Sequence, residues 1–190
     1  MLMGEGKSSL PKQYFYELNK LLDSLDARPK PTHSPRGLAH RGTLGDFTSI
    51  VCFKALFAGL EDLLGAEASG VVFIRAGRLR GQNLVEDWGV GHLQIPLEKL
   101  GHLLDAAFGH DGTRLCVIHG VKQSGENIVV SLTDTICSVG EPEQSVRRCT
   151  FTLGAVWGAL EALTGKKFLA QQTGSVLAGE EYDQFTFTPL

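Results

Sequence analysis

The chain has 190 residues, of which 43% are hydrophobic, and its 18 basic and 21 acidic side chains give a net charge of −3. This length and composition suit one globular domain with its own hydrophobic core. The charge balance argues against duplex nucleic acid as a partner, because domains that bind it are usually basic. No apolar run approaches the roughly 18 residues of a membrane span.

Four single cysteines occur without a CxxC pair, and the N-terminus lacks the apolar stretch of a secretory signal. Reduced, largely buried thiols are the usual state of such cysteines. We therefore expect a cytoplasmic protein. The cysteines are Cys52, Cys116, Cys137 and Cys149.

Two segments at the start of the chain are expected to precede the main domain. Residues 11–27 begin with proline and repeat apolar side chains at helical spacing, which predicts an amphipathic helix. Residues 28–45 carry three prolines among basic side chains, and prolines disrupt both helix and sheet. We therefore divide the chain into 1–45, a helix and a basic linker, and 46–190, the main domain.

Two amphipathic helices are predicted in the first half of the main domain. Residues 46–64 carry a wide apolar face, with Asp46 as the predicted N-cap and a glycine directly after the helix. Residues 95–108 repeat the pattern, with Pro96 in the first turn and Gly109 at the end. Each helix has one apolar face, so both are expected to cover the core.

Two further helices, at residues 68–85 and 147–163, each contain a pair of glycines four positions apart. A glycine costs a helix about 1 kcal/mol relative to alanine, so its presence calls for a compensating gain. Close contact between helix backbones, where a side chain would not fit, provides that gain. The three arginines near the first pair, Arg75, Arg78 and Arg80, are expected to be solvated. The helix-packing glycines are Gly77, Gly81, Gly154 and Gly158.

Four strands complete the predicted domain. Residues 114–121 and 127–134 are β-branched runs joined by a short turn, which is typical of an antiparallel hairpin. Residues 167–172 and 182–188 are predicted to form a second pair, turning at Gly179. The order of helices, hairpin, helix and hairpin predicts an α+β domain in which helices cover an antiparallel sheet.

Two stretches resemble the 4-vinyl-reductase-type domain family. They are residues 60–84, with LEDLLG and FIRAGRLRG, and residues 152–187, with TLGAVWGALEALTGKKFLAQQTGSVLAGEEYDQFTF. Domains of this family bind small molecules or hydrocarbons, alone, in bacteriochlorophyll synthesis or in the sensory parts of aromatic-responsive regulators. The resemblance covers about residues 47–188. It implies the fold of transport protein particle subunits and of haem-based nitric-oxide sensors.

Many members of that family hold zinc with a Cys, a Glu and two further Cys. Counted from Cys149, the other three positions carry Gln172, Ser175 and Asp183 in this chain. An amide and a hydroxyl are poor zinc ligands, so we expect no metal here. Cys149 is then interpreted as a small buried residue. The two arginines before it also make it the best candidate for a reactive thiol, because nearby positive charge lowers the pKa of a cysteine.

No catalytic arrangement is indicated elsewhere. The G-x-S-x-G, P-loop and G-x-G-x-x-G patterns are absent, and the six histidines show no paired spacing. His102 alone has a position suited to a haem axial ligand, by analogy with the haem sensors, and we interpret it as an ordinary histidine. We expect neither enzymatic activity nor a cofactor.

The sequence leaves two functional hypotheses open. In the first, the protein is a non-catalytic module, a sensor or carrier, that binds a hydrophobic or aromatic small molecule between helices and sheet. In the second, side chains fill that space, and the domain is a dimeric assembly protein that pairs through its glycine-bearing helices. A homodimer is expected. Trp157 is the leading contact residue, with core packing as its alternative role. The predicted ligand-binding residues are Leu104, Phe108, Val117, Ile128, Val130, Leu153, Trp157 and Leu169.

Overall fold

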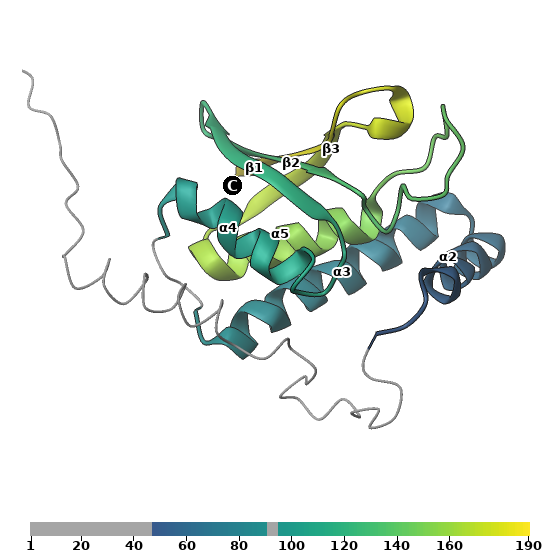
Figure 1. Ribbon diagram of the computed structural model, residues 1–190, viewed down its shortest axis with the longest axis horizontal. Helices are drawn as coiled ribbons and strands as arrows, with labels where there is room; N and C mark the ends of the chain where they lie inside the picture. Colours follow the sequence, from purple (N-terminus) through teal and green to yellow (C-terminus); the bar gives the residue numbers. More distant parts are fainter. Residues whose placement is uncertain (1–46, 91–94) are drawn as a thin grey trace, which may run out of the picture. The chain divides into compact units, whose positions relative to one another are not determined.

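The computed structural model describes residues 47–90 and 95–190, all within one compact unit. The predicted order of elements and the α+β class are confirmed (Figure 1). The predicted helix at 11–27, the linker at 28–45 and the cap Asp46 lie outside the described residues. The helices are α2 (Ile50–Leu64), α3 (Ala66–Trp88), α4 (Leu97–Phe108) and α5 (Thr150–Thr164). The strands are β1 (Val117–Ser124), β2 (Asn127–Thr133), β3 (Phe168–Gly174) and β4 (Asp183–Pro189), with a 3-10 turn, η1 (Val176–Ala178), before β4.

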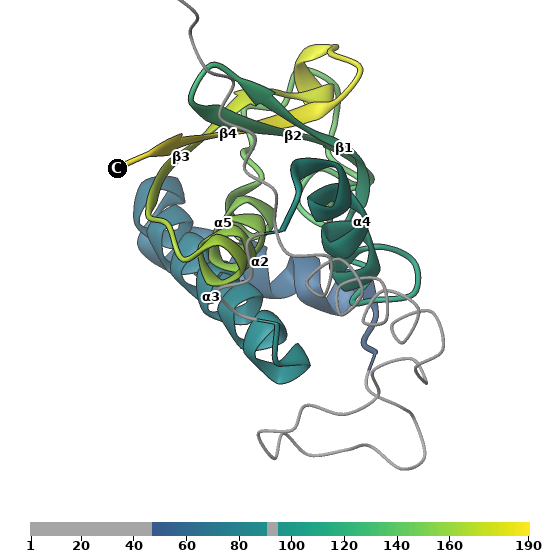
Figure 2. The same ribbon diagram turned by 90° about the vertical axis from the view of Figure 1, so that its left-hand side faces the viewer.

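The sheet has the order β1-β2-β4-β3, and every pair of neighbours is antiparallel. Figures 1 and 2 show α4 and α5 on the same side of the sheet. The core lies between them and the inner sheet face, where five apolar side chains have at most 1% exposure: Val130, Leu132, Phe168, Phe185 and Phe187. None of the helices in the described ranges is long and apolar enough to cross a bilayer.

Helices α3 and α5 make the most extensive contact between elements in the described part of the chain. Their backbones touch at the predicted glycines. A methyl group built on Gly81 would lie 2.0 Å from the carbonyl oxygen of Ala155, and one on Gly158 would lie 2.0 Å from that of Arg78. The other two positions are equally closed to a side chain, at Gly77 and Gly154. Only glycine permits this approach, because a real Cβ never comes that close to another atom.

Several element boundaries differ from those predicted. Helix α2 begins at Ile50 with Ser49 as its N-cap, whose hydroxyl accepts a hydrogen bond from the Val51 amide at 3.2 Å. Strand β1 begins at Val117 rather than at residue 114, because Arg114 has a φ of 54°, which no extended strand accommodates. Helix α5 begins three residues later than predicted, after Cys149.

The glycine contact predicts opposite effects of alanine at two helical positions. Gly81→Ala is expected to lower the free energy of unfolding by about 3 kcal/mol or more, because the new methyl forces two helix backbones apart. Gly59→Ala in α2, where an added Cβ has nothing within 4 Å, is expected to raise it by up to about 1 kcal/mol. Urea unfolding measures both. Equal effects of the two substitutions would contradict this account of the contact.

Candidate functional site

The eight predicted ligand-binding residues differ in their exposure to solvent. Ile128 and Trp157 are half-buried, whereas Val117 and Leu169 are 38% and 57% exposed. The exposed pair therefore does not face the interior between helices and sheet. The four residues that remain for that interior are buried, and they come from α4, β2 and α5: Leu104, Phe108, Val130 and Leu153.

Trp157 is held in an ionic cluster between α3 and α5. Its indole nitrogen donates to Glu161 at 3.1 Å, and the Arg78 guanidinium carbon lies 4.4 Å from the ring centroid. Arg78 also donates to Glu161 through Nε at 3.2 Å. The expectation that Arg78 is solvated is therefore wrong. Its carboxylate partner lies on another helix, far away in the sequence, and only the fold brings the two together.

Glu161 is nearly fully buried and yet fully paired. Besides Arg78 and Trp157, it accepts a hydrogen bond from the Phe168 amide, and the Lys167 ammonium lies 3.4 Å away. Burial by itself would raise the pKa of Glu161, but the hydrogen bonds and these positive charges outweigh it and lower the pKa below its ordinary value. The carboxylate thus ties α3, α5 and the start of β3 together. This arrangement gives Trp157 a structural role.

The positions that correspond to the family's zinc ligands converge only in part. Gln172 accepts a hydrogen bond from the Cys149 amide at 2.8 Å, and its side-chain NH2 lies 3.4 Å from Asp183. Ser175 instead caps η1 by accepting from the Leu177 amide. In residues 47–90 and 95–190, no three His, Cys, Asp or Glu side chains lie close enough together to hold a metal ion. The residues present therefore do not fit zinc.

Asp183 is the centre of a hydrogen-bonded network at this place. It has 0% exposure, and the hydroxyls of Ser138 and Thr135 donate to its Oδ2 at 3.2 and 3.4 Å. The amide of Val176 donates to Oδ1 at 3.1 Å. Because a buried carboxylate needs such donors, this network joins the end of β2, the start of β4 and η1.

A second buried thiol, Cys137, lies on the segment between β2 and α5. Its sulfur is 3.5 Å from the Thr152 hydroxyl, the sulfur of Cys149 is 3.3 Å from the Thr135 hydroxyl, and both cysteines have at most 1% exposure. The neighbouring Cys149 thiol, together with hydrogen bonds from Thr152 and the Phe151 backbone, lowers the pKa of Cys137 in spite of its burial. The neighbouring Cys137 thiol, burial and the charge of Asp183 raise the pKa of Cys149. The prediction that Cys149 has a lowered pKa is therefore wrong.

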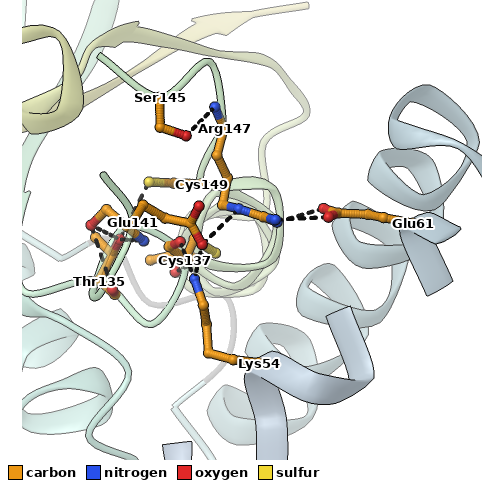
Figure 3. Close-up of polar contacts among 10 residues, drawn as sticks. Lys54, Glu61, Thr135, Cys137, Glu141, Ser145, Arg147 and Cys149 are labelled. Carbon is orange, nitrogen blue, oxygen red and sulfur yellow. Dashed lines mark hydrogen bonds and ion pairs between the residues drawn. The ribbon is translucent and has the colours of Figure 1, made fainter. Parts of the chain in front are cut away.

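The guanidinium of Arg147 points away from the thiols, toward α2 (Figure 3). Its Nη2 donates to Glu61 at 2.7 Å, and its Nε lies 2.9 Å from Glu141. Lys54 of α2 pairs with Glu141 and donates to the Cys137 carbonyl at 3.2 Å. Burial opposes ionisation of Glu141, yet the Lys54 and Arg147 hydrogen bonds lower its pKa. These ion pairs fasten α2 to the loop that carries both thiols.

Sequence reasoning missed Cys137 and the α2 ion pairs. Cys137 lies in the irregular segment between β2 and α5, where no motif marks it. Its partners come from the first turn of α5. The only available signal was the presence of two cysteines on either side of one loop.

Comparison with solved structures places the chain in a fold used by sensory and trafficking proteins. The phenol-responsive sensory domain of the transcription activator PoxR, solved with phenol, is 17% identical, with 90% of each chain covered and a TM-score of 0.61. A trafficking protein particle complex subunit 3 from Naegleria fowleri, covalently bound to palmitic acid, is 11% identical, with 74% of this chain and 92% of that chain covered and a TM-score of 0.54.

An H-NOX protein from S. oneidensis in the Fe(II)NO ligation state is 13% identical, with 93% and 89% covered and a TM-score of 0.52. A vinyl-4-reductase family protein from Methanocaldococcus jannaschii, 13% identical over 98% of this chain and 99% of that chain, superposes at a TM-score of 0.47. No protein-family model matches the chain, and no curated protein matches its sequence. The shared fold that the resemblance implied is confirmed.

Zinc binding tests the interpretation of the Cys149 network. After dialysis against zinc, we expect the protein to retain no stoichiometric metal by elemental analysis, and we expect EDTA to leave its melting temperature unchanged. A variant that combines Gln172→Glu, Ser175→Cys and Asp183→Cys restores carboxylate and thiolate ligands and is the matched positive control. Retention of zinc by the unmodified chain would contradict the interpretation.

Proposed function

We propose that this domain is a non-catalytic module that binds a hydrophobic or aromatic small molecule, as a sensor or a carrier. The observation that carries the proposal is that two structures with this fold hold such a molecule: phenol in one and palmitic acid in the other. The phenol-bound domain is similar over 90% of both chains. Their sequence identities are low, so this similarity supports a way of binding and leaves the ligand open.

The interior between α4, α5 and the sheet is the proposed location. The four buried residues that we expect to line it are all aliphatic or aromatic, and they carry no polar side-chain atom. An ionised group placed there would lose its hydration without gaining a partner, which is costly. The part of the ligand that enters is therefore uncharged. This apolar composition, with few polar groups, is typical of small-molecule sites.

The non-catalytic part of the proposal rests on the state of the polar groups that do converge. The hydroxyls, thiols and carboxylate around Asp183 are buried and hydrogen-bonded to one another. None of them is presented to a bound substrate. A cytoplasmic location, expected from the four free thiols, stays a prediction.

Native mass spectrometry of the full chain tests the binding hypothesis, followed by titration with phenol and with palmitate as probes. Leu153→Phe adds bulk to the proposed interior and is expected to weaken binding of the better probe by about tenfold. Leu169→Phe makes the same type of change at an exposed position and is expected to have no effect. The filled-core alternative would be favoured if the unmodified protein retains no co-purified small molecule and also binds neither probe.

The alternative, an assembly function, is favoured by a surface that the described chain leaves uncovered. Large apolar side chains of α2 and α3 are exposed there, and a hollow at the junction of the two helices is lined by Leu64, Gly65 and Val71 with their neighbours. Leu63 and Val71 are 77% and 69% exposed. The other exposed large apolar residues of α2 and α3 are Ile50, Val51, Leu56, Leu64, Val72 and Leu79, and we call the whole set the α2/α3 surface.

A second copy of the chain is the proposed occupant of the α2/α3 surface. Apolar surface of this extent marks interaction sites, and a two-fold pair would place it against itself. The glycine faces of α3 and α5 already contact each other inside one chain. A dimer therefore uses the opposite face of α3 together with α2. Ligand binding and dimerisation use different surfaces and are compatible.

Light scattering tests the dimer. The unmodified chain is expected at twice the 20.5 kDa of one copy. Leu63→Glu and Val71→Glu are each expected to reduce the mass to that of one copy, because a carboxylate in the centre of an apolar interface loses its hydration. Val146→Glu, at a loop side chain that is 97% exposed, is the matched control and is expected to leave the mass unchanged. A monomeric mass for the unmodified chain would refute the dimer.

A further inference from the structure

Helix α2 lies across the end of the domain where α4 ends and α5 begins (Figures 1 and 2). The ring of Phe53 meets that of Phe151, in the first turn of α5, edge to face with centroids 5.2 Å apart. Just before α2 begins, the ring centroid of Phe47 lies 4.8 Å from the guanidinium carbon of Arg114, in the segment between α4 and β1. The chain thus runs from beside the end of α4 to the start of α5, the two helices that bound the proposed ligand space.

Two of the four buried residues expected to line that space lie at this same end. Phe108 is the last residue of α4, and Leu153 lies in the first turn of α5. They are 0% and 7% exposed. Helix α2 contributes none of the four. Its place therefore indicates a cover over one end of the ligand space rather than a wall of it.

Few buried contacts hold α2 to the domain. Phe57 is the only buried residue among its 15, whereas ten of the 15 residues of α5 are buried. The contacts of α2 with the segment between β2 and α5 are ionic, from Lys54 to Glu141 and from Glu61 to Arg147. Segments with few buried apolar contacts open locally at a low free energy. Release of α2 therefore costs less than release of α5.

A single glycine joins α2 to α3. Gly65 has a φ of 78° and a ψ of 162°, a conformation that is essentially restricted to glycine, and a Cβ added to it would have nothing within 4 Å. The torsions of such an uncrowded residue can change without a clash, so Gly65 suits a hinge between the two helices. Helix α3 itself is fixed by its glycine contact with α5. Rotation at Gly65 would therefore move α2 and leave the rest of the domain in place.

We propose that α2 is a lid over the space between α4, α5 and the sheet, and that it turns about Gly65 to admit and release the hydrophobic ligand. This role of α2 rests on the binding function proposed above. The ion pairs of Lys54 and Glu61 hold the lid closed (Figure 3). Because α2 supplies none of the four lining residues, the free energy of closing is the same with and without ligand. A weaker lid therefore speeds entry and release alike and leaves the Kd unchanged.

The rates of ligand entry and release test the lid. Association and dissociation of tritiated phenol and of tritiated palmitate are followed by rapid filtration with the full chain. Lys54→Met and Glu61→Gln each remove an ion pair of α2 and are expected to raise both rates about fivefold, with the Kd changed by less than about twofold. Lys122→Met and Glu126→Gln make the same changes on the exposed hairpin. They are the matched controls and are expected to leave both rates unchanged.

Hydrogen exchange of the ligand-free chain shows separately whether α2 opens. A released helix of 15 residues is only marginally stable in water, so opening exposes its amides to exchange. In Lys54→Met and Glu61→Gln, the amides of α2 are expected to exchange about fivefold faster and those of α5 at an unchanged rate. Unchanged exchange in α2, or an equal acceleration in α5, would overturn the hinged lid.

The two measurements together separate the lid from the binding function. Faster exchange in α2 with unchanged rates of ligand entry and release would show that α2 opens without controlling access, and would overturn the lid alone. A higher Kd with an unchanged association rate would show that α2 contacts the ligand, and would do the same. If the unmodified chain retains no small molecule and binds neither probe, the binding function fails and the lid with it.

Discussion

The contact between the α3 and α5 backbones determines where everything else in the domain lies. Four glycines bring the two helix backbones so close that no side chain fits between them at these positions, and a ligand would not fit there either. The Arg78–Glu161 pair with the indole of Trp157 then fastens one edge of the contact. Because α3 occupies one face of α5, only the opposite face is left to meet the sheet. We therefore propose the sheet side of α5, next to α4, as the place of an internal ligand.

At the N-terminal end of α5, hydrogen bonds join three of the four positions for which the family resemblance implies zinc ligands. A zinc ion would join the start of α5 to the last two strands through four ligands. Here hydrogen bonds of Gln172 and Asp183 join the same segments. The hydroxyls of Ser138 and Thr135 donate to Asp183 and so connect the segment after β2 as well. Each such bond contributes about 1 kcal/mol net, but loss of one partner leaves the others buried and unsatisfied at higher cost. The network therefore stabilises the junction only when it is complete.

Periodicity and turn residues were sufficient to predict the order of the elements and the α+β class, because each of those signals is local. The glycine spacing also identified the residues at the helix contact. Features that depend on distant partners were out of reach. Arg78 finds its carboxylate on another helix, and Cys137 acquires its donors from the start of α5. The sequence also did not predict the positive φ of Arg114, which prevents strand β1 from beginning at that residue. The sequence shows which side chains are present, and only the fold shows which of them meet.

Helix α2 is held mainly by a stack of Phe57 on Phe73, with ring centroids 3.7 Å apart, and by its ion pairs. One side of α2 exposes large apolar side chains, and another carries the ion pairs of Lys54 and Glu61 to the segment between β2 and α5. Any partner that binds the outward side favours the docked helix by mass action and so lowers the population of the open form. If that partner is a second copy of the chain, the docking of α2 would depend on protein concentration. A helix with little buried surface of its own is thus the element whose position a partner would most easily change.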